Sequence, residues 1–342
     1  MLRCPVCSRQ WDGERESCSL CEFPISQFKS LLSGELVLGN RELEQEYKEA
    51  IDRAFANFLS TTIVLSVCLG HSMCRLSIVC IRNDSFGVLE PIAVLSSSDF
   101  FEMRGFDFLT FVISLFYSNI GVAKVDGIAM SIPCPVEYAG ESVFLHPHWS
   151  GWPEDFIGAL RRRLGCEKVA ILNDAVAFAL GCFHEQQVND LQFPILCLTL
   201  GTGIGCAILQ KEGENLRVKP FELLRIRRWW PVGFEGDPHE LAGAPFFSYV
   251  RHYTDWGVEE TKHQFSIRIV LIIREIEKDL NFNSVLLGGG RVRFANADEI
   301  SENLSKQVRI MDRPELSLRG AAYGWALHFL WGRKLYEVIE NP

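Results

Sequence analysis

Four cysteines stand within the first 21 residues, in two tight pairs. Cys4 and Cys7 form one pair, Cys18 and Cys21 form the other, and ten residues separate the pairs. Two such pairs supply the four sulfur ligands of a tetrahedral Zn²⁺ site, which is closed and therefore structural. A segment of roughly 25 residues buries too little apolar surface to fold alone, so the metal would supply the folding energy. The spacing predicts a zinc ribbon with bound Zn²⁺ over residues 1–25.

The same cysteines also fit disulfide bonds or an iron site. The first residues, MLRCPVC, lack the apolar stretch of a signal peptide, which argues against an oxidising compartment and hence against disulfides. The eight later cysteines lie singly in largely apolar contexts, as reduced core thiols do. We therefore expect a cytoplasmic protein. The motif does not specify whether the ribbon contacts nucleic acid, the rest of the chain or a protein partner.

The rest of the chain has the composition of a soluble globular protein with two or three domains. The whole chain has 342 residues, of which 48% are hydrophobic and 23% charged. The net charge of −9 argues against broad nucleic-acid binding, and the longest apolar runs are too short to span a bilayer. We therefore expect neither a nucleic-acid partner nor a membrane span.

From residue 62 onward, apolar strand-like runs alternate with helical segments. Before them, residues 26–61 indicate a connector and an amphipathic helix, the latter over 40–60. The predicted strands cover 61–69, 74–81, 87–96, 124–133, 169–172, 193–200, 206–210 and 284–290, and the predicted helices cover 106–118, 151–165, 173–186, 245–255, 262–280 and a segment from 316. This alternation is typical of α/β proteins, and we place two lobes at 62–170 and 171–342.

A glycine-rich turn lies between two predicted strands, in the sequence LTLGTGIGCAIL (198–209). Glycines let backbone N–H groups approach a phosphate closely, and a threonine can add a hydroxyl donor. The turn leads into a strand, so it is neither a P-loop nor a dinucleotide-binding fingerprint, both of which need a following helix. Gly201, Thr202 and Gly203 are therefore candidates for phosphate binding, although such a hairpin also occurs for structural reasons alone.

Two further segments place polar or small residues at strand ends. Asn173 and Asp174 end one strand and open a helix. Either residue suits an N-cap, and Asp174 can alternatively act as a general base on a substrate hydroxyl. Gly288, Gly289 and Gly290 end the strand SVLLGGG, where they form either a plain strand-to-helix turn or a backbone surface for a nucleotide base and ribose.

Taken in series, these segments resemble the ROK family of repressors, open reading frames and kinases, which has the hexokinase–actin–Hsp70 ATPase fold. The stretches MSIPCPVE (130–137), ILNDAVAFALG (171–181), LLGGGRV and LSLRGAAYGWAL (316–327) resemble the family's motifs in the same order. The resemblance covers about residues 62–335. It implies a two-lobed, actin-like (ribonuclease H-like) ATPase fold that closes over ATP with Mg²⁺ and a sugar, and it implies a homodimer.

The resemblance also implies a role for each motif. Asp174 would take the proton of the sugar hydroxyl as that hydroxyl attacks the γ-phosphate of ATP. Backbone donors at the glycine turn would stabilise the phosphates, and the glycines at 288–290 would face adenosine. The family's remaining ligand positions fall on Asn173, Glu222 and His148 for the sugar and on Gly70 and Ser72 for the phosphates.

The chain departs from the family's first phosphate motif, D-x-G-G-T-x-x-R. The matching stretch is CLGHSMCR (68–75), in which Cys68 replaces the aspartate that helps to hold Mg²⁺. A thiol is a poor ligand for such a hard cation. This substitution puts metal binding and phosphoryl transfer in question.

The sugar-binding positions differ as well. His148 replaces an asparagine, Cys182 replaces a glutamate, and Glu222 alone remains of the family's E-x-G-H pattern. No cysteine follows Cys206, so the family's own zinc site is missing. Residues 225–243 take its place, as either a surface loop with stacked arginines and tryptophans or a surface for a ligand or partner.

These matches and departures support two main functions. The first is an ATP-dependent sugar kinase that phosphorylates a sugar or amino-sugar hydroxyl with Asp174 as general base. The second is a catalytically impaired pseudokinase that binds nucleotide or sugar and acts as a sensor or protein-interaction module through its ribbon. Retention of Asp174 favours the first, and Cys68 favours the second. A third reading is a transcription regulator, against which the acidic charge and the lack of a helix-turn-helix pattern argue.

We expect the purified protein to contain about one zinc ion per chain, because four thiolates complete a structural site. The variant Cys4→Ser/Cys7→Ser should lose this zinc, whereas Cys166→Ser, outside the motif, should keep it. Elemental analysis of the metal content measures both. Full zinc content in the double variant would show that the metal is bound elsewhere.

Overall fold

A computed structural model describes the chain in parts, and its contacts separate two units, Met1–Ile171 and Leu172–Pro342. The described residues are 2–3, 10–11, 62–70, 73–82, 85–88, 93–96, 106–107, 109–110, 113, 125–137, 142–143, 152–153, 155–213, 215–223, 226–313, 315–333 and 338. Near the N-terminus, β1 (Leu2–Arg3) pairs antiparallel with β2 (Gln10–Trp11). The four cysteines of the predicted ribbon and the helix predicted for 40–60 lie outside the described residues.

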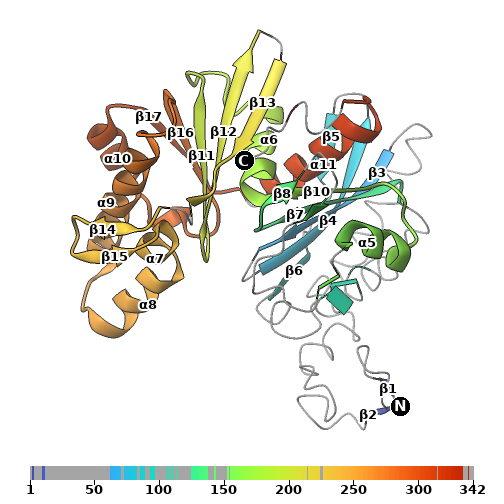
Figure 1. Ribbon diagram of the computed structural model, residues 1–342, viewed down its shortest axis with the longest axis horizontal. Coiled ribbons are helices and arrows are strands. Elements are labelled where there is room, and N and C mark those ends of the chain that lie inside the picture. Colours follow the sequence, from blue (N-terminus) through green and yellow to red (C-terminus); the bar gives the residue numbers. More distant parts are fainter. Residues whose placement is uncertain are drawn as a thin grey trace. The chain divides into compact units, whose positions relative to one another are not determined.

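The first unit is built on one sheet with strand order β10-β7-β3-β4-β5, and β6 also pairs with β4 (Figure 1). The strands of this sheet are β3 (Thr62–Leu69), β4 (Met73–Arg82), β5 (Ser85–Val88), β6 (Ala93–Ser96), β7 (Gly127–Ile132) and β10 (Val169–Asn173), whose last two residues already belong to the second unit. β3 is antiparallel to β4 and parallel to β7. Nearly every residue of β3 and β7 is buried, as expected of central strands whose sequences are continuous apolar runs.

The sequence predicted one strand over 87–96, and the structure has two. β5 and β6 both pair antiparallel with β4, but in different registers. An unbroken register from Val88 opposite Val79 would place residue 91 opposite Leu76, whereas Ala93 stands there. Pro91, which has no amide hydrogen to donate to a ladder, falls between the two strands in the sequence.

Smaller elements complete the first unit. β8 (Val136–Glu137) pairs with β9 (Ser142–Val143), and the described residues of the helix predicted for 106–118 are helical. The helix predicted for 151–165 begins later, as α5 (Phe156–Leu164). Asp155 caps it by accepting a hydrogen bond from Gly158 N, and Gly165 ends it in the left-handed conformation (φ 64°).

The second unit repeats the strand arrangement of the first. Its sheet has the order β13-β12-β11-β16-β17 and comprises β11 (Ile195–Leu200), β12 (Ile204–Glu212), β13 (Asn215–Pro220), β16 (Ser284–Gly288) and β17 (Gln307–Met311). An antiparallel hairpin of the first two strands continues into a third, and two later strands add to the other edge of the first strand. The five strands in the main path of each sheet therefore follow the same order in both units.

Helices cover both faces of this second sheet (Figure 1). They are α6 (Asp174–His184), α7 (Pro238–Ala242), α8 (Ala244–Tyr253), α9 (Val258–Ile276) and α10 (Ala297–Leu304), with a 3₁₀ turn at Val292–Phe294. A further helix, α11 (Glu315–Phe329), packs on α6. Alternate β11 residues Leu196, Leu198 and Leu200 point into a core shared with α7, α8 and α9. The intervening Cys197 and Thr199 face α6, as the two-residue period of a strand requires.

Residues 225–243, which the sequence left as a loop or a binding surface, contain regular structure. β14 (Arg228–Trp230) and β15 (Phe234–Gly236) form a hairpin that precedes α7. Trp230 is buried, and its indole N–H donates to Gly236 O at 2.8 Å. The Arg228 guanidinium lies over the Trp230 ring at 5.5 Å, so an arginine–tryptophan stack is present, while Trp229 is 63% exposed.

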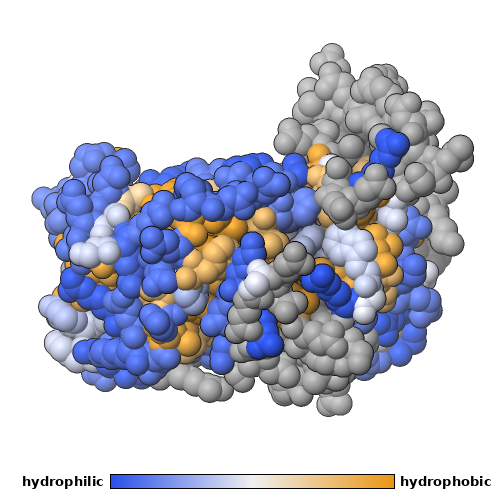
Figure 2. Space-filling model, turned by 90° about the horizontal axis from the view of Figure 1, so that it is seen from above, coloured by the Kyte–Doolittle hydropathy of each residue, from blue (hydrophilic) through white to orange (hydrophobic). Residues whose placement is uncertain are grey.

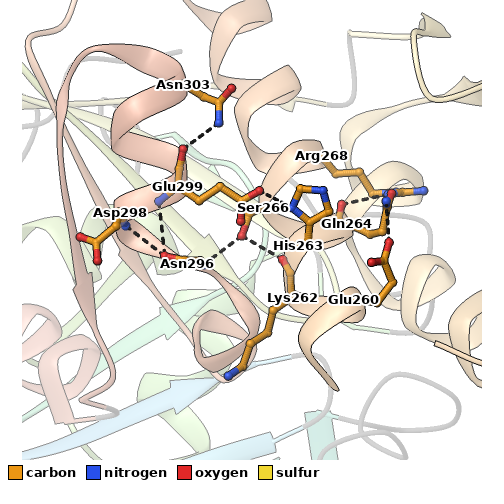
Figure 3. Close-up of polar contacts among 10 residues, drawn as sticks. All are labelled: Glu260, Lys262, His263, Gln264, Ser266, Arg268, Asn296, Asp298, Glu299 and Asn303. Carbon is orange, nitrogen blue, oxygen red and sulfur yellow. Dashed lines mark hydrogen bonds and ion pairs between the residues drawn. The ribbon is translucent and has the colours of Figure 1, made fainter. Parts of the chain in front are cut away.

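α10 is fixed to α9 by polar contacts (Figure 3). Asn296 caps α10, and its own N–H donates to Ser266 Oγ of α9 at 2.9 Å. Ser266 Oγ in turn donates to Lys262 O at 2.9 Å. His263 Nδ1 and Glu299 Oε1, one on each helix, are 2.5 Å apart. These polar contacts hold α10 against α9.

α6 and α11 touch at their backbones. A Cβ atom at Gly320 would lie 1.7 Å from Ala177 O, and one at Gly181 would lie 2.0 Å from Leu316 O. No side chain fits at either position, so two glycines allow the helix axes to approach closely. This contact holds α6 in place along its length.

Most of the coloured surface in Figure 2 is hydrophilic, with hydrophobic residues showing in strips between hydrophilic ones. The large hydrophobic side chains that are exposed in the described part of the chain are Trp229, Tyr249, Tyr253, Val258, Leu330 and Trp331. Among the described residues, no helix combines the length and the apolar character needed to cross a lipid bilayer.

Candidate active site

Asp174 is the first residue of α6, directly after β10. Asn173 caps the helix, because its side-chain oxygen accepts hydrogen bonds from Ala175 N at 3.0 Å and Val176 N at 3.4 Å. Asp174 Oδ1 accepts from Ala175 N at 2.8 Å. Capping is thus carried chiefly by Asn173, and the Asp174 carboxylate is held at the helix N-terminus, where the helix dipole favours a negative charge.

The Asp174 carboxyl has an unusual proton affinity. Burial raises its pKa to about 6, the Ala175 N–H and the Thr199 hydroxyl oppose this rise, and the negative charge of Glu222 adds to it. A carboxylate with a pKa near neutrality is ionised at pH 7 and still basic enough to accept a proton, which suits a general base. Glu222 acts on the same carboxylate, so the structure brings these two predicted residues together.

Gly205 is the reason that the carboxylate can stand against the sheet. A Cβ atom there would lie 2.3 Å from Thr199 Oγ1 and 2.9 Å from Asp174 Oδ1. Any other residue would push the carboxylate or the hydroxyl away. This glycine of the glycine-rich motif therefore serves the packing of Asp174.

The turn between β11 and β12 consists of Gly201, Thr202 and Gly203. Gly201 N donates to Gly203 O at 2.9 Å, so a bound phosphate would compete for that donor. A Cβ atom at Gly203 would approach His239 Nδ1 to 2.6 Å, whereas one at Gly201 would meet only Gly203 O, at 3.8 Å. The need for glycine is therefore steric at Gly203 and is not steric at Gly201.

The third glycine segment lies beside the same turn. Arg291 N donates to Leu200 O at 3.0 Å, and a Cβ atom at Gly289 would lie 2.6 Å from Leu200 O. Gly289 has a φ of 92°, which favours glycine, and Gly288 packs against a phenylalanine ring. Only Gly290 has open space at its Cβ position. The predicted phosphate and adenosine segments thus meet at one end of the second sheet.

The remaining predicted residues belong to the first unit or lie outside the described part. Gly70 follows β3, and Cys68 is buried in that strand, with Arg75 opposite it in β4 and Ser131 opposite it in β7. Ser72 and His148 lie outside the described residues. Among the described residues, no three or more His, Cys, Asp or Glu side chains are arranged to hold a metal ion.

Two residues at the site were not found from the sequence. Thr199 could have been, because strand alternation places it on the face opposite Leu198 and Leu200. His239 gave no local signal, since it stands 35 positions after Ile204, whose N–H it accepts. A contact of that kind depends on how α7 packs on the hairpin.

Comparison with known proteins identifies the fold. Residues 112–214, which include Asp174 and the glycine turn, match the ROK family model. No curated protein matches the chain by sequence. The inorganic polyphosphate/ATP-glucomannokinase of Arthrobacter sp. strain KM is 19% identical, with a TM-score of 0.60 over 78% of this chain and 99% of that chain.

Two other solved structures are similar. A ROK family glucokinase from Streptomyces griseus, solved with glucose and AMPPNP, is 16% identical, with a TM-score of 0.59 over 76% of this chain and 98% of that chain. A ROK family transcriptional regulator, a homologue of the E. coli MLC protein, is 17% identical, with a TM-score of 0.54 over 80% of this chain and 78% of that chain. The predicted two-lobed α/β, actin-like fold is therefore confirmed, as the fold that these ROK proteins share.

The raised pKa of Asp174 should make stability depend on pH. Ionisation is disfavoured in the folded state, so the contribution of Asp174 to the free energy of unfolding should fall as pH rises from about 4 to about 6 and then level off. Asp174→Asn removes this penalty and should stabilise the protein at pH 7 by on the order of 3 kcal/mol, with no gain near pH 4.

Chemical denaturation at several pH values between 4 and 7 measures this effect. The exposed Asp279, in the turn after α9, provides the matched control Asp279→Asn, which makes the same change of side chain away from the site. An Asp174→Asn protein whose stability differs from the wild type by the same amount at every pH would contradict the prediction.

Proposed function

We propose that the chain is a ROK-family, ATP-dependent sugar kinase, which transfers the γ-phosphoryl group of ATP to a hydroxyl of a sugar or amino sugar. The observation that carries the proposal is the Asp174 carboxylate, held by α6 against Gly205 beside the glycine turn with a pKa of about 6. The family match over residues 112–214 and the fold shared with kinases of glucose and mannose type support the same function.

In this proposal, Asp174 accepts the proton of the attacking hydroxyl. Its buried carboxylate is ionised at pH 7, and its pKa lies close enough to neutrality for proton transfer to assist the reaction. Asn173, Glu222 and His148 contact the sugar. Glu222 already acts electrostatically on Asp174, so a sugar between them would have two carboxylates as hydrogen-bond acceptors.

The nucleotide is proposed to lie where the two glycine segments of the second sheet meet. Thr202 and Gly203 face its phosphates together with Gly201, the glycines at 288–290 face adenosine, and Gly70 and Ser72 contribute from the first unit. Bound ATP would bring Mg²⁺, which usually keeps phosphate and water ligands and needs few protein carboxylates. Only part of the magnesium site would therefore come from the protein.

Cys68 supports a second candidate, a catalytically impaired pseudokinase. The residue is buried in β3, where the family's motif has an aspartate. A protein that binds nucleotide or sugar without turnover could act as a sensor through the ribbon at 1–25 and a protein partner. We further propose a cytoplasmic homodimer, with residues 26–61 connecting the ribbon to lobes at 62–170 and 171–342.

Calorimetric titration with ATP and ADP, with and without Mg²⁺, tests the first step. Where ATP binds, release of ADP is then screened with hexoses, N-acetylhexosamines and N-acetylmannosamine. We expect Asp174→Asn to lower kcat by about 10²- to 10⁴-fold, because it removes a general base but keeps the shape of the side chain. Asp279→Asn should leave kcat unchanged. Absence of nucleotide binding by the wild type would rule out the kinase proposal. Unchanged turnover in Asp174→Asn would show that Asp174 is not the general base.

Restoring the acidic residue separates the kinase from the pseudokinase. Cys68→Asp should increase turnover at low Mg²⁺ concentration, because a carboxylate is a good ligand for this ion. Cys68→Ser has no negative charge and should not. Burying the new carboxylate should also lower the free energy of unfolding by about 1–3 kcal/mol unless Mg²⁺ and ATP are present. Turnover in neither the wild type nor Cys68→Asp, with ATP bound in both, would favour the pseudokinase.

A further inference from the structure

His239 lies beside the glycine turn, on a helix whose start is well fixed. It is carried by α7, a short helix with proline at its first position and a capping box at its start. Asp237 Oδ1 accepts from Glu240 N at 3.0 Å, and Glu240 Oε2 accepts from Asp237 N at 3.0 Å. Reciprocal bonds of this kind fix the first turn of a helix and hence the direction of its side chains.

The imidazole makes one specific contact with the turn. Ile204 N, the first amide after the turn, donates to His239 Nδ1 at 3.0 Å. The ring also fills the space beside Gly203, where a Cβ atom would lie 2.6 Å from Nδ1. Within the described part of the chain, Nε2 is buried and makes no hydrogen bond. The bond to Ile204 is therefore what orients the ring.

The next helix holds the other side of the turn. Ala244 N, at the start of α8, donates to Thr202 O at 2.7 Å. A Cβ atom at Gly243 would lie 2.6 Å from the same oxygen. Residues 239–244 thus contact Thr202 within the turn and Ile204 directly after it, so the shape of the turn is set by α7 and α8 as well as by the strands.

The acceptor role of Nδ1 requires a neutral ring. Burial lowers the pKa of His239, and the carboxylates of Asp237, Glu222 and Glu240 act in the opposite direction. In the neutral ring with Nδ1 accepting, the proton resides on Nε2. In the protonated ring, Nδ1 also carries a hydrogen, which would face the Ile204 N–H and break the contact.

We propose that His239 is a positioning residue for the glycine turn: its neutral Nδ1 anchors the Ile204 amide and thereby holds Gly201–Gly203 in the shape that binds nucleotide phosphates. The inference rests on the proposed function, since it takes this turn to be the phosphate site. The inference goes beyond the proposed function because it makes a residue outside the predicted motifs responsible for the shape of that site.

Two substitutions separate anchoring from simple packing. His239→Asn places an amide oxygen where Nδ1 stands, and so it keeps the acceptor for Ile204. His239→Gln places its amide near Nε2 and loses that acceptor. Titration with ADP should give a Kd for His239→Asn within about threefold of the wild-type Kd. The Kd for His239→Gln should be about tenfold higher than that of the wild type. Adenosine, which has no phosphate, should bind all three proteins alike.

The pH dependence gives a second readout. As pH falls and His239 is protonated, ADP affinity should decrease in the wild type but not in His239→Asn, whose amide does not titrate. Asp174 titrates equally in both proteins, so the difference between them reports His239. Equal weakening of ADP and adenosine in His239→Gln, or the same acid response in His239→Asn and wild type, would overturn the proposal.

Amide hydrogen exchange of the ligand-free proteins keeps the test independent of the proposed function. The Ile204 amide should be protected in the wild type and in His239→Asn and should exchange at least tenfold faster in His239→Gln. If the wild type binds no nucleotide but this pattern holds, the phosphate role fails and the anchor stands. If Ile204 is equally protected in all three proteins, the anchor itself is wrong.

Discussion

The backbone contact between α6 and α11 is the constraint on which the candidate site depends. Gly181 and Gly320 leave no side chain between the two helices, so α6 cannot shift without losing that contact. With α6 fixed, its first residue, Asp174, is carried against the β11–β12 hairpin. Because Gly205 has no side chain, the carboxylate fits closely against the backbone of β12. Two pairs of close approaches thus hold a charged group where burial disfavours its charge, as is typical of functional carboxylates.

The same strand order in the two units gives their first hairpins equivalent places. The first strand of the β3–β4 hairpin ends at Leu69, and that of the β11–β12 hairpin ends at Leu200. A glycine follows each of these leucines directly. Cys68 and Thr199 stand one residue before these strand ends. Thr199 lies beside Asp174, whereas Cys68 is a buried thiol. The two hairpins therefore have one architecture and different chemistry. The repeat is one of topology, which explains why the sequence shows no internal repeat.

Much of the fold could be predicted from the sequence, because the central strands are continuous apolar runs and their alternation with helices is plain. The strand predicted for 87–96 was wrong as a single element, since the register on β4 changes by two residues on either side of Pro91. The hairpin of β14 and β15 was missed. Its strands are three residues long, and its stability depends on burying Trp230 in a core assembled from distant segments.

The candidate site divides in a similar way. Asp174 and the glycine turn lie in local motifs, and the sequence placed both at strand ends, where they stand. The sequence could not show that Gly203 and Gly205 are needed for packing against His239 and Asp174, because each contact joins segments that are far apart in the chain. The roles of Asn173 and Glu222 toward a ligand stay predictions. So does the zinc ribbon, whose cysteines lie outside the described residues.

The balance between the kinase and the pseudokinase depends on which missing or retained group matters more. In the proposed kinase, a magnesium ion bound to ATP would take most of its ligands from phosphates and water, so Cys68 in place of one carboxylate would weaken the binding of the ion without abolishing it. A general base contributes about 10²- to 10⁴-fold to a rate and has no substitute from the substrate. The chain has kept the second group and buried it where its pKa lies near 6. That burial has a cost in stability, and a carboxylate with only a capping role would avoid it, because Asn173 already caps the helix. The role proposed for Asp174 as a general base would account for this energetic cost.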